Sequence, residues 1–197
     1  MIKKILPLAL LLLTACTQSS VQAPNVPPPP VAETLDHVYQ VAEYTIEYPN
    51  AFTVTENDTL IAEEFEIQGT SFTFPESYRA GNVLDEAKVH IGWHIGECEN
   101  DHPRTSMTTL GGNQLDKKEW KGAAAGNLYE GITYTKYGSP MPSAPTKCQN
   151  MLLTLYMHSC NLGSACSDGH TGVLDKKPLI DMFTRMLGTL KITGIRS

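Results

Sequence analysis

The chain has 197 residues, with 15 Lys and Arg against 21 Asp and Glu, so its formal net charge at pH 7 is −6. This acidic balance argues against nucleic acid as a partner and against electrostatic docking on anionic lipid. The sequence contains no Gly-x-Ser-x-Gly, His-Glu-x-x-His or phosphate-binding glycine-rich motif, which favours a protein that is not an enzyme and indicates no cofactor.

The first residues, MIKKILPLALLLLTAC, have the three parts of an export signal. Lys3 and Lys4 supply a positive start, and the apolar stretch from Ile5 to Leu13 follows, interrupted only by Pro7. This stretch is too short to cross a bilayer, because a spanning helix needs about 20 apolar residues. A basic start, a short apolar segment and small residues before a cleavage point predict a signal peptide over residues 1–15.

The segment Leu13-Thr14-Ala15-Cys16 resembles the lipobox of bacterial lipoproteins. In that family the cysteine thiolate receives a diacylglyceryl group, the signal is cut just before it, and the new amine is acylated, as with palmitate. The resemblance therefore implies a lipoprotein anchored through Cys16. The alternative is an ordinary secretory signal that is cut elsewhere, with Cys16 incidental.

The resemblance also implies a location. Two acyl chains hold a protein stably on a membrane, so we expect the mature chain to sit on a bilayer without crossing it. In the enteric sorting rule an Asp after the lipidated cysteine retains lipoproteins in the inner membrane, and here Thr17 stands at that position. We therefore expect the periplasmic face of the outer membrane of a Gram-negative bacterium, with the inner membrane and the cell surface as open alternatives.

Residues 16–32 form the predicted tether between Cys16 and the folded part. The stretch lacks charge and carries five prolines, a composition that favours extended polyproline II and cannot bury a core. It reaches at most about 45 Å at ~3.1 Å per residue. Residues 33–197 are enough for one globular periplasmic domain, and without the signal peptide the chain keeps 13 basic and 21 acidic residues, a formal charge of −8.

Alternating apolar residues predict most of the domain to be strands. Residues 44–48 and 52–54 form two strands around a Pro-Asn turn, residues 65–74 form a hairpin or a bulged strand around Gly69, and residues 88–98 form a further strand. Between these last two, residues 80–87 are interpreted as a turn or one helical turn with Asn82 as its N-cap.

The second half continues with a tight Gly-Gly-Asn turn and a strand that begins near Asn127. Residues 148–158 are apolar on both faces near their middle, which indicates a central strand. Apolar residues between Leu179 and Leu187 fall at helical spacing, with Gly188 at the expected C-terminus, and residues 190–192 predict a closing strand. The order of elements predicts an α+β fold, a mainly antiparallel sheet with a C-terminal amphipathic helix packed on it.

Three segments carry a looser resemblance: YTIEYPNAFTV, FTFPESYRAGNVLDEAKVHI and FTRMLGTLKI. They resemble the PsbP-like α/β/α sandwich, a superfamily of extrinsic photosystem proteins and bacterial lipoproteins. This resemblance implies a binding or assembly module and transfers no functional residues.

Four cysteines remain after Cys16, and an exported protein meets an oxidising compartment. Four cysteines allow three connectivities. We favour Cys98–Cys148, because the two residues lie at the adjoining ends of predicted antiparallel strands, and Cys160–Cys166, which closes a short loop.

The alternative use of this segment is a metal site formed by His158, Cys160, Cys166 and His170. Thiolate and imidazole suit zinc or copper, but the spacing fits no common zinc module, so our prediction is that the chain holds no metal. His90 and His94 make no second pair, since four residues of strand separate them by about 13 Å. A nucleophilic cysteine, Cys148 or Cys160 with His158 as base, is a further alternative without a supporting motif.

The functional expectation is a lipid-anchored, non-enzymatic binding or structural module. It would engage another envelope protein through a sheet face or a loop such as residues 137–145. One alternative is a small inhibitor like the lysozyme-inhibitor lipoproteins, which usually form β-barrels and are disfavoured by the predicted helix. The other is a metal-binding domain built on residues 158–170.

Overall fold

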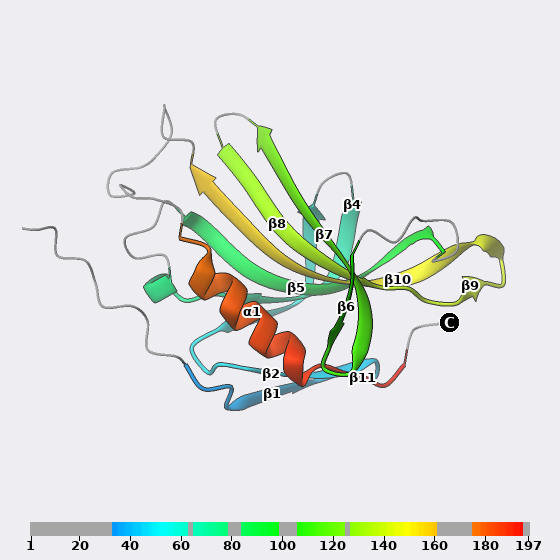
Figure 1. The fold of residues 1–197 in the computed structure, drawn as a ribbon, viewed down its shortest axis with the longest axis horizontal. Helices are drawn as coiled ribbons and strands as arrows, with labels where there is room; N and C mark the ends of the chain where they lie inside the picture. Colours follow the sequence, from blue (N-terminus) through cyan, green and yellow to red (C-terminus); the bar gives the residue numbers. More distant parts are fainter. Residues whose placement is uncertain are drawn as a thin grey trace, which may run out of the picture.

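The computed structural model describes residues 33–62, 65–78, 84–98, 106–124, 127–160 and 175–194, except for the side chain of Cys160. In this part of the chain a long, twisted antiparallel sheet carries helix α1 on one face, with a small second sheet beside the helix (Figure 1). The elements are β1 (His37–Gln40), β2 (Tyr44–Tyr48), β3 (Thr53–Ala62), β4 (Phe65–Thr73), the short 3₁₀ helix η1 (Glu76–Tyr78), β5 (Leu84–Glu97), β6 (Met107–Leu110), β7 (Asn113–Ala124), β8 (Asn127–Lys136), β9 (Pro140–Met141), β10 (Ala144–Cys160), α1 (Lys177–Thr189) and β11 (Lys191–Ile192).

The larger sheet has the strand order β3-β4-β5-β10-β8-β7-β6, and β9 pairs with the beginning of β10. Every pairing recorded in the described residues is antiparallel. The predicted central strand is confirmed, because β10 lies between β5 and β8 along most of its length. The predicted fold class, a mainly antiparallel sheet with a C-terminal helix, is confirmed as well.

The main hydrophobic core lies between the sheet and α1. On β10 the residues Met151, Leu153 and Leu155 point toward this core and are fully buried. The helix meets them with one apolar face, as expected of an amphipathic helix. Its buried residues are Leu179, Met182, Phe183, Met186 and Leu187.

The helix ends one residue later than the sequence suggests. Gly188 lies inside its last turn, and Leu190 leaves the helix with an extended backbone while its N–H bonds to the carbonyl of Leu187. The expectation that Gly188 terminates the helix was therefore wrong, because an extended residue leads straight into β11. The predicted closing strand is confirmed, since β11 pairs with β2. Among the described helices, none has the length and apolarity needed to cross a bilayer.

The turn between β6 and β7 docks on the end of α1. Gly111 and Gly112 both have positive φ, 56° and 77°, which confirms the predicted Gly-Gly-Asn turn. A Cβ on Gly111 would come within 2.7 Å of the carbonyl oxygen of Leu187. Asn113 Nδ2 donates a hydrogen bond to the carbonyl of Leu190 at 3.0 Å. The turn thus needs glycine both for its backbone angles and for its contact with the helix.

The strands β3, β4 and β5 differ from the prediction in two ways. Residues 65–73 form one uninterrupted strand, and the extra residue of the bulge lies on β3, between Thr55 and Asp58. Gly69 is instead required by a close approach, because a Cβ there would lie 2.0 Å from the carbonyl oxygen of Ile91. Residues 84–87 already belong to β5 and are not helical, while the proposed N-cap Asn82 lies outside the described residues.

Candidate functional site

The face of the sheet that points away from α1, called here the outer face, holds a second hydrophobic cluster. Its buried members are Leu60, Ala62, Ile67, Trp120, Leu152 and Tyr156. These residues come from β3, β4, β7 and β10, although β3 and β7 are far apart in the strand order. The sheet therefore curls around its outer face, so that side chains from distant strands meet there.

Trp120 on β7 is held in place by its neighbours on β8. It lies opposite Gly131, where a Cβ would come within 2.3 Å of the indole ring. The indole Nε1 donates a hydrogen bond to Thr133 Oγ1 at 3.0 Å, and this hydroxyl is also bonded to that of Thr154 at 3.1 Å. Glycine opposite a tryptophan thus makes space for the ring, and two threonines on the next strands fix its orientation.

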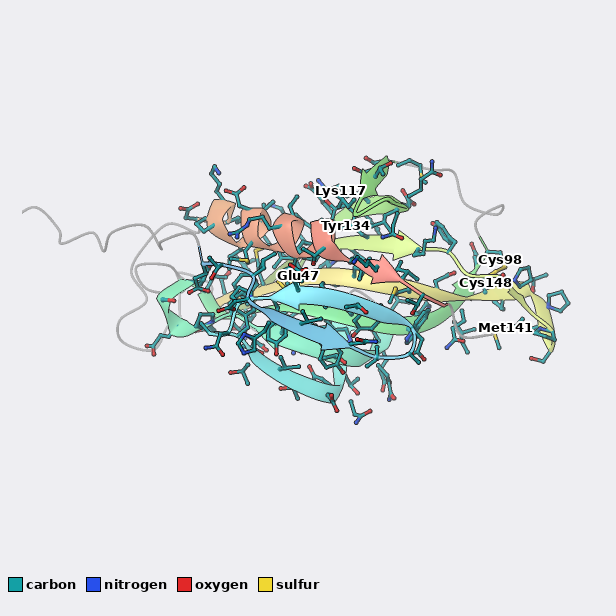
Figure 2. All side chains as sticks on the ribbon, turned by 90° about the horizontal axis from the view of Figure 1, so that it is seen from below. Glu47, Cys98, Lys117, Tyr134, Met141 and Cys148 are labelled. Atoms are coloured by element: carbon teal, nitrogen blue, oxygen red, sulfur yellow. A yellow bond between two sulfur atoms is a disulfide. The ribbon has the colours of Figure 1, made fainter. Side chains whose placement is uncertain are left out.

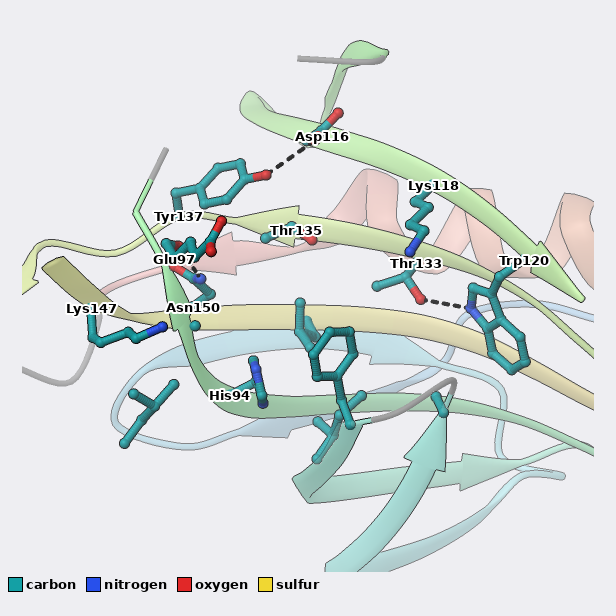
Figure 3. A pocket seen from close by; sticks show the side chains of 16 residues that line it. His94, Glu97, Asp116, Lys118, Trp120, Thr133, Thr135, Tyr137, Lys147 and Asn150 are labelled. Atoms are coloured by element: carbon teal, nitrogen blue, oxygen red, sulfur yellow. Dashed lines mark hydrogen bonds between the residues drawn. The ribbon is translucent and has the colours of Figure 1, made fainter. Parts of the chain in front are cut away.

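Beside this tryptophan the curled sheet encloses a half-open cavity of about 550 Å³ (Figure 3). This volume lies within the range of about 300–1,000 Å³ that is usual for small-molecule sites. Its apolar lining is Ala62, Phe65, Ile67, Ile95, Trp120 and Leu152, and its polar lining includes His94, Glu97, Asp116, Lys118, Thr133, Thr135, Tyr137, Lys147 and Asn150. The cavity therefore combines an apolar wall with polar groups at its rim.

Several of the polar groups at the rim hold one another. The Tyr137 hydroxyl donates to Asp116 Oδ2 at 3.1 Å, and the Ser106 N–H donates to the other carboxylate oxygen at 3.3 Å. Asn150 is buried, accepts a bond from the Gly138 N–H at 3.2 Å and donates to the main-chain carbonyl of Glu97 at 3.0 Å. These bonds link β5, β7, β8 and β10 and give the rim a defined shape.

One end of the cavity is lined by His94, Glu97 and Lys147. The ring of His94 packs on that of Phe65, with centroids 4.5 Å apart. Burial, together with the positive charge of Lys147, lowers the pKa of His94. Lys147 faces Glu97 across the β5–β10 ladder but forms no ion pair with any described residue. At neutral pH His94 is therefore mostly uncharged. The ammonium of Lys147 is the cation at this end of the cavity.

Comparison with known proteins does not assign this site. No protein-family model, no curated protein and no solved structure matches the chain.

A buried polar chain lies on the same face, further along β5. Ser71 Oγ donates to Asp58 Oδ2 at 2.5 Å, His90 Nδ1 lies 2.9 Å from the same hydroxyl, and Lys88 Nζ lies 3.3 Å from Asp58. Burial lowers the pKa of His90 to about 4, partly opposed by the charge of Asp58. Serine stands between the acid and the imidazole, and Ser71 is only 1% exposed. This order does not activate a serine for attack on a substrate, so we interpret the chain of bonds as structural.

The predicted disulfide between Cys98 and Cys148 is present, with an S–S distance of 2.08 Å and Cα atoms 5.0 Å apart. Figure 2 shows it at the end of the sheet where β10 begins. It excludes Cys148 as a free nucleophile. Because Lys147 precedes Cys148, the disulfide also ties the charged end of the cavity to β5.

The second predicted disulfide and the alternative metal site cannot be placed. Cys166 and His170 lie outside the described residues, and the side chain of Cys160 does as well. His158 is near the end of β10, where its ring stacks on Tyr129 at 4.9 Å. Among the described residues, no group of three or more His, Cys, Asp and Glu is arranged to hold a metal.

The sequence did not predict the cavity, but one strand that lines it shows a pattern of alternating histidine and glycine. The alternation of His90, Gly92, His94 and Gly96 on one face of a strand was apparent, and the structure places this face outward. Glycine at alternate positions leaves space beside a strand, which is one sign of a hollow surface. Nothing local connects these residues with Trp120, because that contact depends on the curl of the sheet.

Proposed function

We propose that this protein is a lipid-anchored module of the bacterial cell envelope that binds an apolar ligand group in the cavity of its outer face, without catalysis. The single observation that carries the proposal is the cavity of about 550 Å³, whose apolar wall reaches the surface. Phe65 is 40% exposed and Ile95 is 55% exposed at this site. Large apolar side chains that line an open hollow are typical of ligand-binding surfaces.

The polar groups around the cavity support binding better than they support chemistry. Asp116 and Asn150 are committed to hydrogen bonds that shape the rim. His94 packs on an aromatic ring, and its lowered pKa leaves it mostly uncharged at neutral pH. Hydrogen bonds hold several polar groups of the rim in place, and the wall is apolar, so the cavity suits recognition of an apolar group.

A cavity-filling variant tests this proposal. Thr135 lines the cavity, so Thr135→Phe places a ring inside it. Val38→Phe is the matched control, because Val38 is a 61% exposed residue on β1 in the other sheet. We expect the neutral fluorescent probe N-phenyl-1-naphthylamine to bind the exported Cys16→Ala chain and Val38→Phe alike, and Thr135→Phe at least about tenfold more weakly, the scale of one lost apolar group in a pocket. Equal binding to all three proteins would contradict the cavity as the binding site.

The lipid anchor is a separate part of the proposal and rests on the Leu13–Cys16 motif. Acylation at Cys16 would hold the module on the periplasmic face of the outer membrane, at the end of the tether over residues 16–32. We expect Cys16→Ala to move the protein from the membrane fraction to the soluble periplasmic fraction. Retention of the variant on membranes to the same degree as the natural chain would refute lipidation.

Kinship with the PsbP-like superfamily is proposed only at the level of the fold. The C-terminal helix packed on an antiparallel sheet supports it. The described residues carry a helical layer on one face of the sheet, whereas an α/β/α sandwich has helices on both. The same helix argues against the lysozyme-inhibitor alternative, because those proteins usually form β-barrels, whereas here a helix packs on one face of the sheet.

Intact mass spectrometry separates the binding module from the metal-binding alternative at residues 158–170. With Cys98 and Cys148 already joined, a second lost pair of hydrogens in the unreduced, denatured chain identifies the Cys160–Cys166 disulfide. This is the result that we expect. Two free thiols together with a zinc-sized or copper-sized adduct in the native spectrum would instead make the Cys/His loop the site to mutate.

A further inference from the structure

We infer that the ligand of the cavity is an amphipathic anion, an apolar chain that ends in a carboxylate or a phosphate, with the anionic end bound at Lys147. This inference rests on the proposed function, namely that the cavity is a binding site, and it adds the chemical class of the ligand. It depends on the charge at one end of the cavity, the apolar surface at the other end and the distance between them.

Two carboxylates and two amines line the cavity: Glu97, Asp116, Lys118 and Lys147. Asp116 accepts hydrogen bonds from Tyr137 and Ser106, and Glu97 and Lys118 also have interaction partners. Lys147, by contrast, has no ion pair or side-chain hydrogen bond to another described residue. The charge that remains available to a ligand is therefore positive.

Two further observations place this charge at the mouth of the cavity, where Lys147 is exposed. Figure 3 shows the side chain of Lys147 extending along the cavity toward Asn150, with His94 nearby. The pKa of His94 is lowered by burial and by the charge of Lys147, so the cation acts on a partly desolvated group. An anionic group at this mouth can therefore form a charge-assisted hydrogen bond with an ammonium that no described carboxylate already holds.

The opposite end of the cavity is mainly apolar, although Lys118 also points into it beside Thr133 (Figure 3). Ile67, Trp120 and Leu152 are buried there, and Phe65 closes the side toward His94. From Lys147 to Leu152 the strand β10 advances by about 17 Å at ~3.3 Å per residue. The cavity therefore has a cation near one end and mainly apolar side chains toward the other, which suits an amphiphile with an anionic head.

The size of the cavity selects a small amphiphile over a protein partner. A volume of about 550 Å³ holds a single chain or ring system. A stable protein partner would bury about 800 Å² on each side, which requires a much larger surface than this hollow. A carboxylate and a phosphate are both anions that can accept a hydrogen bond from Lys147, so ligands with either head group are tested.

The experiment uses the exported Cys16→Ala chain, which has no acyl group of its own to compete for the cavity. Trp93→Phe leaves Trp120 as the single tryptophan, because the chain has two. Its fluorescence is followed during titration with decanoate, decyl phosphate, decanol and decyltrimethylammonium, each below its critical micelle concentration. We expect decanoate or decyl phosphate to bind at least about tenfold more tightly than decanol, the size expected for one charge-assisted hydrogen bond.

Lys147→Gln should remove this preference for the anion. Lys191→Gln is the matched control, because it deletes the same charge at an exposed position on β11, in the other sheet. As an independent readout, bound decanoate should raise the pKa of His94, measured by NMR titration, since the anion offsets the charge of Lys147.

The possible results distinguish the preference for an anion from the use of the cavity as a binding site. If decanol binds as tightly as decanoate, or if Lys147→Gln and Lys191→Gln behave alike, the anion inference is overturned while the cavity remains a binding site. If none of the four compounds binds saturably, the proposed function and the inference both fail. If decyltrimethylammonium binds most tightly, the inference is also overturned, because the carboxylates Glu97 and Asp116 would then determine which charge the cavity prefers.

Discussion

Lowering the pH from 7 to 5 should destabilise this protein, and the largest contribution should come from the buried His90. His90 is 0% exposed, its Nε2 forms no well-aligned hydrogen bond, and burial lowers its pKa from 6.5 to about 4. The unfolded chain binds a proton near pH 6.5, whereas the folded chain resists protonation until about pH 4. The stabilisation is therefore complete above pH 6.5 and is lost as the pH falls toward 4.

The magnitude follows from these two pKa values. At about 1.4 kcal/mol per pH unit, the whole interval corresponds to about 3 kcal/mol, of which about 2 kcal/mol falls between pH 7 and pH 5. Asp58, which bonds to Ser71 beside His90, acts in a different window. Burial opposes its ionisation, but the Ser71 hydrogen bond and Lys88 outweigh that effect and lower its pKa, so its contribution is lost only below the ordinary value of 3.8.

Urea unfolding at pH 7 and pH 5 measures this effect in the natural chain, in His90→Gln and in His37→Gln. Glutamine at position 90 can still donate to Ser71 but does not titrate. His37 is an exposed histidine, so His37→Gln serves as the control for removing any histidine. We expect His90→Gln to lose about 2 kcal/mol less than the other two proteins between the two pH values. The same pH dependence in all three would refute the assignment of the effect to His90.

Two further predictions concern the frame that holds the site. Removing the disulfide with Cys98→Ser and Cys148→Ser together should lower the free energy of unfolding by about 4 kcal/mol according to the loop-entropy model, since the cysteines are 50 residues apart. Urea titration at pH 7 tests this value, and an unchanged midpoint would contradict it. Gly111→Ala should lower the stability more than Gly112→Ala. Both positions have positive φ, which costs a non-glycine residue about 1–3 kcal/mol in either variant. Only at Gly111 does the new Cβ meet another group, the carbonyl of Leu187 at 2.7 Å, so equal thermal midpoints for the two variants would refute that contact.

The two faces of the larger sheet hold different features. The face under α1 supplies the main core and the stability of the domain. The outer face carries the cavity and the buried His90 chain.

The sequence by itself determined the features that depend on neighbours along the chain. Period-two apolar alternation predicted β2, β5 and β10, and helical spacing predicted α1, because each pattern follows from local backbone geometry. The turn at Gly111 and Gly112 was apparent for the same reason. The Cys98–Cys148 disulfide could be predicted because both cysteines mark the ends of strands that proved to be neighbours.

Other local predictions failed where a tertiary contact overrides a local preference. Gly188 does not end the helix, because Leu190 must extend to carry β11 beside β2. Residues 84–87 join β5 and are not helical, because pairing with β10 extends the strand to Leu84. The bulge lies on β3 instead of β4, and Gly69 serves a close approach of two strands.

The tertiary structure alone decided the candidate site. Trp120 and Ile67 are distant in sequence and in strand order, and they meet only because the sheet curls around its outer face. The low pKa of His90 likewise depends on burial by strands from other parts of the chain, and the position of Lys147 at the cavity depends on the pairing of β10 with β5. Periodicity assigns each side chain to one face of its strand, but the position of that strand in the sheet and the curvature of the sheet arise from packing over the whole domain.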